Sequence, residues 1–183
     1  RQFSTDLTEN WTEEHMKSIF QSFPNTPLTI LLDETGLADD TLIEVVGNVC
    51  AHSAAHHTVA LTDPTATQLG QSMASCVRTD RPDGLFTTVV VARTGEALGL
   101  VYSSPESIVA ALECGRGVYY SRSRQGLWRK GDTSGHYQTL HRFDVDCDGD
   151  ALKCTVTQNT ADATKQPAFC HLETYTCWGQ SRS

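Results

Sequence analysis

Three aspartates in the last quarter of the chain could bind a hard metal ion. Asp146, Asp148 and Asp150 recur at every second position in the stretch D-C-D-G-D. Alternate residues of an extended strand share one face, so the three carboxylates of such a strand would point the same way. Carboxylate oxygens are ligands that suit Mg²⁺. The spacing therefore predicts a magnesium site.

Three cysteines in the same region offer a second, softer set of ligands. Cys147 lies between the aspartates, and Cys170 and Cys177 follow in F-C-H-L-E-T-Y-T-C. Thiolates suit Zn²⁺, and three protein ligands instead of four leave a coordination position for water, which indicates catalysis. The alternative for any cysteine is burial as a small apolar residue. We expect that structural role for the other four cysteines: Cys50, Cys76, Cys114 and Cys154.

The run from Asp144 to Gly149 also resembles the start of an EF-hand loop, with its glycine at loop position six. Position twelve of such a loop should be a bidentate glutamate, and here it is Thr155. The flanking segments are typical of strands and not of helices. A calcium sensor is therefore disfavoured.

A local cluster of cations stands out on an acidic chain. The net charge is −8, which argues against general nucleic-acid binding. The segment 116–130 nevertheless holds no acidic residue and five basic ones: Arg116, Arg122, Arg124, Arg129 and Lys130. Such a cluster is suited to a small phosphorylated anion. The alternative is a solvated surface strand.

The loop that follows, K-G-D-T-S-G over Lys130–Gly135, combines two glycines with two hydroxyls and a lysine. Its backbone N–H groups could curl around an anion, and Ser134 and Gly135 are candidate contacts. The loop lacks the Walker pattern, because its lysine precedes the first glycine and a strand is expected after it. An NTPase is therefore disfavoured.

The composition is that of a globular protein. The chain has 183 residues, 39% of them hydrophobic and 20% charged, and no apolar run of the length needed to span a bilayer. Seven cysteines, an odd number, fit a reducing compartment better than a disulfide framework. With no secretion signal, we expect a cytoplasmic protein. The chain begins at Arg1 and not at Met, which suggests a processed product or a piece of a longer protein.

Residues 1–77 alternate helical and strand patterns. Helices are predicted over 13–20, from 39 or 40 to 49, and from Pro64 onward, with short strands over 28–32 and 58–61. This alternation predicts a small α/β region. It contains no evident catalytic motif, so we expect a structural role.

Residues 78–183 are dominated by strand patterns. Strands are predicted over 85–91, 97–102, 118–123, 127–130, 138–145 and 152–158. One helix is predicted between them, capped by Ser103 or Ser104 and ended by Gly115. The sequence thus predicts a sheet-dominated α+β domain.

Several motifs in 81–179 resemble the phosphoribosyl-AMP cyclohydrolase family of histidine biosynthesis. They are D-G-L-F-T-T, S-R-S-R-Q-G-L-W-R-K-G-D-T-S-G-H-Y-Q, D-C-D-G-D-A-L and F-C-H-L-E-T-Y-T-C. The sequences of these motifs are most similar to the cyclohydrolase portion of fungal multifunctional histidine-biosynthesis proteins. Residues 1–77 have no counterpart in the short bacterial members. Asp132 stands where bacterial members usually have glutamate.

The resemblance implies a metal-dependent hydrolase. Zinc ligands would fall on Cys147, Cys170 and Cys177, and magnesium ligands on Asp146, Asp148 and Asp150. It also implies an intertwined homodimer whose shared active sites take zinc cysteines from both subunits. The substrate would be phosphoribosyl-AMP, with no nucleic-acid or membrane partner.

The family reaction adds water to C6 of the adenine ring and opens the N1–C6 bond. Three thiolates weaken the acidifying effect of zinc on water, so a protein base is expected to help. His171, beside Cys170, suits that role, and its alternative is to orient a metal ligand. The phosphates are expected to contact Arg116, Arg122, Arg124, Lys130, Ser134 and Gly135. Two other functions stay open: a purine nucleotide deaminase, and a zinc-stabilised dimerisation module without activity.

Overall fold

The computed structural model describes residues 13–22, 29–32, 39–51, 58–61 and 63–179. The chain divides into two compact units, Arg1–Cys76 and Val77–Ser183. The boundary lies one residue from the one predicted from the change in sequence pattern. No described helix is long and apolar enough to cross a bilayer.

The first unit combines short helices with a small parallel sheet. Helix α1 covers Glu13–Ser22, α2 Asp39–Ala51 and α3 Ala66–Ser75, and strands β1 (Thr29–Leu32) and β2 (Thr58–Leu61) pair in parallel. The apolar side of α2, including Leu42, Val45 and Val49, is buried. Helices and strands alternate along the described residues of this unit. Cys76, expected to be a reduced core residue, is instead disulfide-bonded.

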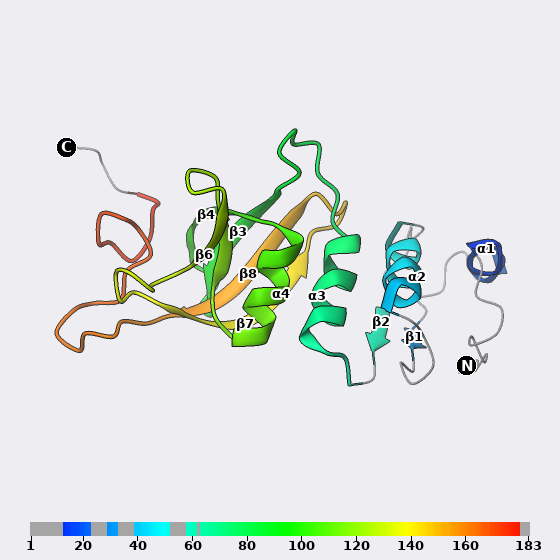
Figure 1. The fold of residues 1–183 in the computed structure, drawn as a ribbon, viewed down its shortest axis with the longest axis horizontal. Helices are drawn as coiled ribbons and strands as arrows, with labels where there is room; N and C mark the ends of the chain where they lie inside the picture. The colour runs from blue at the N-terminus through cyan, green and yellow to red at the C-terminus, as the bar shows by residue number, and fades with distance from the viewer. Residues whose placement is uncertain (1–12, 23–28, 33–38, 52–57, 62, 180–183) are drawn as a thin grey trace. The chain divides into compact units, whose positions relative to one another are not determined.

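The second unit is built on a four-stranded mixed sheet in the order β4-β3-β8-β7 (Figure 1). Strand β3 (Phe86–Ala92) pairs antiparallel with β4 (Ala97–Ser103) and parallel with β8 (Ala151–Gln158), which pairs antiparallel with β7 (Gln138–Val145). A separate hairpin joins β5 (Val118–Ser121) to β6 (Gly126–Arg129). The predicted sheet-dominated α+β class is confirmed for this unit.

Helix α4 (Pro105–Cys114) connects β4 to β5. Ser104 caps its start in a capping box with Ser107, and Gly115, at φ 63°, ends it in the left-handed conformation that glycine adopts without a Cβ penalty. Its Ile108 and Ala111 are fully buried. Cys114, predicted to be buried, is exposed at the last position of the helix.

The core of the second unit lies on one face of the sheet. Val90, Leu152 and Cys154 are buried there, as is Tyr119 of β5, whose hydroxyl donates a 2.6 Å hydrogen bond to Gln138. This confirms the structural role predicted for Cys154.

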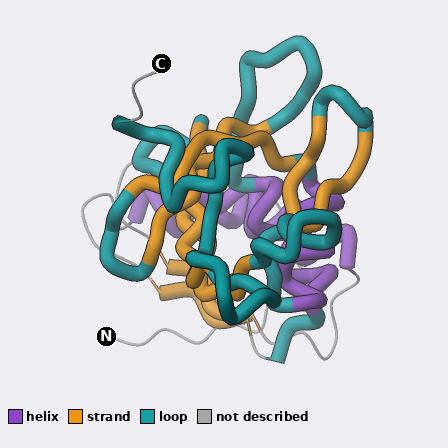
Figure 2. The backbone as a smooth tube through the Cα atoms, turned by 90° about the vertical axis from the view of Figure 1, so that its left-hand side faces the viewer, coloured by secondary structure: helices purple, strands orange, loops and turns teal. Residues whose placement is uncertain are grey.

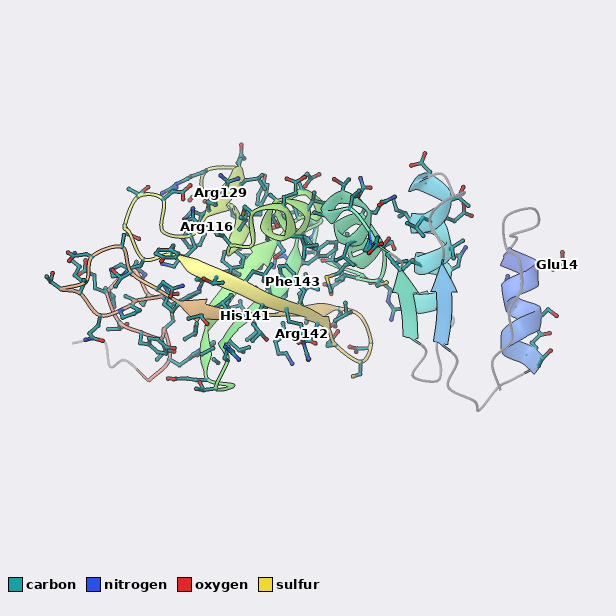
Figure 3. The ribbon with its side chains drawn as sticks, turned by 90° about the horizontal axis from the view of Figure 1, so that it is seen from below. Glu14, Arg116, Arg129, His141, Arg142 and Phe143 are labelled. Atoms are coloured by element: carbon teal, nitrogen blue, oxygen red, sulfur yellow. The ribbon has the colours of Figure 1, made fainter. Side chains whose placement is uncertain are left out.

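The opposite face of the sheet is much more open. Val89 pairs with Leu100 on one side and Lys153 on the other, so these three side chains share a face. None of them is buried, and Leu100 is 46% exposed. His141 and Arg142 on β7 are exposed as well (Figure 3). One surface of the sheet is therefore available for a further layer.

Candidate metal and substrate site

The three aspartates gather in the turn between β7 and β8. Their ligand oxygens lie within 4.8 Å of one another, and all three residues are exposed. They do not lie in a strand as predicted, because β7 ends at Val145 and residues 147–150 form bends. The turn closes around Asp146, whose Oδ1 accepts hydrogen bonds from the backbone N–H of Asp150 (2.9 Å) and of Ala151 (3.1 Å).

The three carboxylates of this turn repel one another. The negative charges of Asp148 and Asp146 raise the pKa of Asp150 above its usual value. Desolvation acts upward on the pKa of Asp146, but hydrogen bonds led by that from Ala151 hold this pKa below its usual value. A cation at this turn would relieve the repulsion. Three clustered carboxylates are a donor set that fits Mg²⁺.

Cys170 and Cys177 lie together beside the start of β4. The N–H of Cys177 donates to the carbonyl of Leu98 (2.8 Å), and the hydroxyl of Thr176 donates to that of Ala97 (2.7 Å). The N–H of Cys170 bonds the carbonyl of Thr174 at 3.0 Å, which closes the segment into a loop. The edge of the sheet thus fixes both cysteines.

The thiol groups of Cys170 and Cys177 influence each other's pKa. A hydrogen bond from the backbone N–H of Leu172 lowers the pKa of Cys170. Desolvation, followed by the bond and charge of Cys170, raises the pKa of Cys177 to about 11. A cation bound by both sulfurs would favour their thiolate forms. Two adjacent sulfurs fit part of a zinc site.

Cys147 lies far from this pair. It belongs to the β7–β8 turn, next to the β8 end where Ala151 pairs with Thr87, whereas Cys177 bonds Leu98 near the far end of β3, where Ala92 pairs with Val156. Five residues of strand separate those ends, or about 16 Å. Figure 1 shows the turn and the C-terminal segment, coloured red, at opposite ends of the unit. Figure 2 looks onto the end that holds the C-terminal segment. One chain therefore does not bring the three cysteines together.

His171 is exposed next to the cysteine pair. Its Nδ1 lies 3.9 Å from the sulfur of Cys170, within range of a weak hydrogen bond. The side chain can thus either orient the sulfur or reach a substrate, the two roles predicted from the sequence.

The hairpin β5–β6 carries two of the predicted phosphate contacts. Arg122 and Arg124 lie in its exposed turn. The guanidinium carbon of Arg122 is 4.1 Å from the ring centroid of Tyr102 on β4. The guanidinium carbon of Arg81 also lies 4.4 Å from the centroid of that ring. Arg81 in turn donates hydrogen bonds of 2.9 and 2.7 Å to the carboxylate of Asp83. Sequence analysis missed Arg81 and Tyr102, because only the fold brings them to the hairpin.

Of the other three basic residues of the segment, Arg116 and Lys130 are engaged within the protein and Arg129 is not. Arg116 Nη2 donates to the carbonyl of Lys130 (3.1 Å) and binds the carboxylate of Asp132 (3.0 Å). Arg129, close to Arg116 in Figure 3, is exposed. Lys130 is buried, with 5% of its surface exposed.

The loop 130–135 folds back on itself. The N–H of Gly135 donates to the carbonyl of Gly131 (2.8 Å), so this donor is already used. Gly131, at φ 93°, has no room for a side chain, since a Cβ would lie 2.5 Å from the backbone of Tyr137. Ser134 is exposed and accepts a bond from the N–H of His136 (3.3 Å).

The imidazole of His136 is a further feature that the sequence did not indicate. It is 4% exposed, and neither ring nitrogen has a hydrogen-bond partner among the described residues. Buried polar groups are normally paired, so the unpaired imidazole is an unusual feature of this loop. The G-H step in the sequence gave no sign of this burial.

Comparison with known proteins identifies the second unit. The family model for phosphoribosyl-AMP cyclohydrolase matches residues 99–179. The phosphoribosyl-AMP cyclohydrolase of Rhodococcus jostii (strain RHA1) is 42% identical over 96 residues, which are 52% of this chain and 78% of that protein. The chain belongs to the phosphoribosyl-AMP cyclohydrolase family.

Fungal histidine biosynthesis trifunctional proteins are also similar. That of Saccharomyces bayanus is 58% identical over 104 residues, and that of Saccharomyces cerevisiae (strain ATCC 204508 / S288c) is 56% identical over the same length. Each match covers 57% of this chain and 12% of the fungal protein. The chain thus spans a small part of these relatives. The match to the cyclohydrolase family covers all six predicted metal ligands and His171.

Proposed function

We propose that this chain hydrolyses phosphoribosyl-AMP, opening the adenine ring between N1 and C6 in histidine biosynthesis. The observation that carries the proposal is the family match over residues 99–179, which contain two donor sets of different chemistry. The aspartate turn fits Mg²⁺, and the sulfurs of Cys170 and Cys177 fit Zn²⁺.

Water is the attacking group in this reaction. Zinc bound at the thiols supplies acidification of that water. His171 accepts the proton as the water oxygen bonds to C6, and the electron pair of the N1–C6 bond passes to N1, which takes up a proton. The amino group stays on C6, now part of a carboxamide, so no ammonia is released.

The exposed cations hold the substrate. Arg122 and Arg124 are placed for the phosphates, with Ser134 as a neutral contact, and Arg81 extends this cationic surface through Tyr102. The carboxylates of Asp146, Asp148 and Asp150 would hold magnesium, which would supply polarisation of substrate oxygens. Arg116 supports these contacts indirectly by fixing the loop through Asp132.

The zinc site requires two chains in this proposal. Cys147 and the other two cysteines lie toward opposite ends of β3, and those ends are about 16 Å of strand apart. A homodimer that places the β7–β8 turn of one subunit against the C-terminal segment of the other completes the set. The open sheet face with Leu100 and the exposed Leu172 and Trp178 near the cysteines supply apolar surface for such an interface.

The test is turnover of phosphoribosyl-AMP by the purified chain, followed spectroscopically, with zinc counted on the same sample. We expect ring opening that stops on chelation, returns with zinc and releases no ammonia. Release of ammonia would favour a purine nucleotide deaminase. Bound zinc without any turnover would favour a dimerisation module.

A further inference from the structure

Lys130 is held in the interior of the second unit by its own backbone. Its N–H donates to the carbonyl of Gly117 (3.0 Å), and its carbonyl accepts from Arg116 (3.1 Å). Both bonds fix the position directly after β6, and the side chain is 95% enclosed, since 5% of its surface is exposed. A lysine in this position cannot swing out to solvent as a surface lysine does.

Two aromatic rings replace part of the water around its ammonium group. Lys130 Nζ lies 5.5 Å from the ring centroid of Phe169 and 5.8 Å from that of Trp128. Ring faces attract a cation, but such contacts do not replace the full hydration of an ammonium group. Among the described residues, no carboxylate forms an ion pair with Lys130. The rings alone leave the buried charge undercompensated.

The segment that carries the cysteine pair packs against the ammonium group of Lys130. Phe169, which covers the ammonium group, directly precedes Cys170 in the chain. Burial lowers the pKa of Lys130, while the charges of Cys177 and Cys170 act to raise it. Lys130 and the two thiols therefore share one partly desolvated environment.

We propose that Lys130 is the counter-cation of the Cys170–Cys177 pair, balancing the charge of the two thiolates when they bind zinc, in place of the phosphate contact expected from the sequence. This inference rests on the proposed zinc site. Zn²⁺ with three thiolates carries one net negative charge, and burying that charge is costly unless a cation lies beside it. One lysine beside the site makes the assembly neutral.

The proposal separates two roles by what each would change. A counter-cation affects how tightly zinc binds in the absence of any substrate. A phosphate contact affects KM and leaves zinc affinity alone. Lys130→Met keeps the length and apolar stem that pack between Trp128 and Phe169 but removes the charge, and Lys130→Arg keeps the charge.

The experiment measures the zinc dissociation constant of the full chain by competition with a chromophoric chelator, without substrate. Arg129→Met, one residue away and exposed, is the matched control. We expect zinc binding to weaken about 10- to 100-fold in Lys130→Met, as for other groups that support metal ligands. Lys130→Arg and Arg129→Met should stay within a few-fold of wild type.

Thermal unfolding of each metal-free variant verifies that it is folded, and Lys130→Gln is a second neutral variant should the methionine one fail this check. A folded Lys130→Met or Lys130→Gln variant that binds zinc as tightly as the wild type would overturn this inference but not the proposed function. Failure of the wild-type chain to bind zinc would overturn the zinc site of the proposed function as well.

Discussion

At the scale of single residues, burial distinguishes basic side chains that look equivalent in the sequence. The segment 116–130 contains five cations, but Arg122 and Arg124 face solvent, Arg116 pairs with Asp132, and Lys130 is enclosed. A count of charges predicts that an anion binds nearby. It does not tell which cations are free to reach it, because that depends on strands distant in the sequence.

Replacing Arg124 by alanine should raise KM for phosphoribosyl-AMP about ten-fold or more and change kcat little. A charge-assisted hydrogen bond contributes about 1.5–3 kcal/mol, and one made equally in the ground and transition states affects binding alone. Steady-state kinetics measure both constants. Arg93→Ala, exposed in the β3–β4 turn, is the control. A fall in kcat at unchanged KM would argue against a phosphate contact.

Replacing Asp148 by asparagine should raise the Mg²⁺ concentration needed for half-maximal turnover by at least about ten-fold. Loss of a group that merely supports a ligand already costs 10- to 100-fold, and Asp148 is proposed as a ligand itself. The measurement is a magnesium titration of activity. Asp80→Asn removes a charge that acts on Asp150 from outside the cluster and should have a smaller effect. Equal effects of the two substitutions would contradict the assignment.

At the scale of elements, local sequence patterns were sufficient for most helices and strands. The helix after β4 was predicted from Ser104 and Gly115, and β7 was predicted with its observed bounds. The aspartate turn was not, because alternation of Asp146, Asp148 and Asp150 looks like a strand. Hydrogen bonds from the backbone to Asp146 turn the chain instead, and such local capping is stronger than the alternation signal.

Contact between β4 and the cysteine segment depends on a glycine. A Cβ added to Gly99 would lie 2.2 Å from the ring of Phe169, the residue before Cys170. Gly99→Ala should therefore lower the free energy of unfolding by about 1–3 kcal/mol and weaken zinc binding. Chemical denaturation and zinc competition measure the two effects. Gly126→Ala, where the nearest atom is 3.9 Å away, should cost less. Unchanged zinc affinity in Gly99→Ala would show that β4 does not position the cysteines.

At the scale of the whole molecule, the distance between Cys147 and the other two cysteines has the largest consequence. Spacing along the chain suggests one set of three ligands. Parallel pairing of β3 with β8 places Cys147 and the Cys170–Cys177 pair toward opposite ends of the sheet. No local pattern encodes that pairing, so composition and spacing could suggest the proposed type of site but not that its three cysteines lie apart in one chain. The expectation of a shared site came from the family resemblance.

Co-expression of two differently tagged variants, Cys147→Ala and Cys170→Ala, tests the central claim most directly. Each variant alone should bind no catalytic zinc and show almost no opening of phosphoribosyl-AMP. In the purified mixed dimer, Cys147 of one chain meets Cys170 and Cys177 of the other at one of two sites, so about half of the wild-type turnover and zinc content should return. A mixed protein as inactive as its parents, or a single variant that keeps full zinc and activity, would contradict a zinc hydrolase site built from two chains.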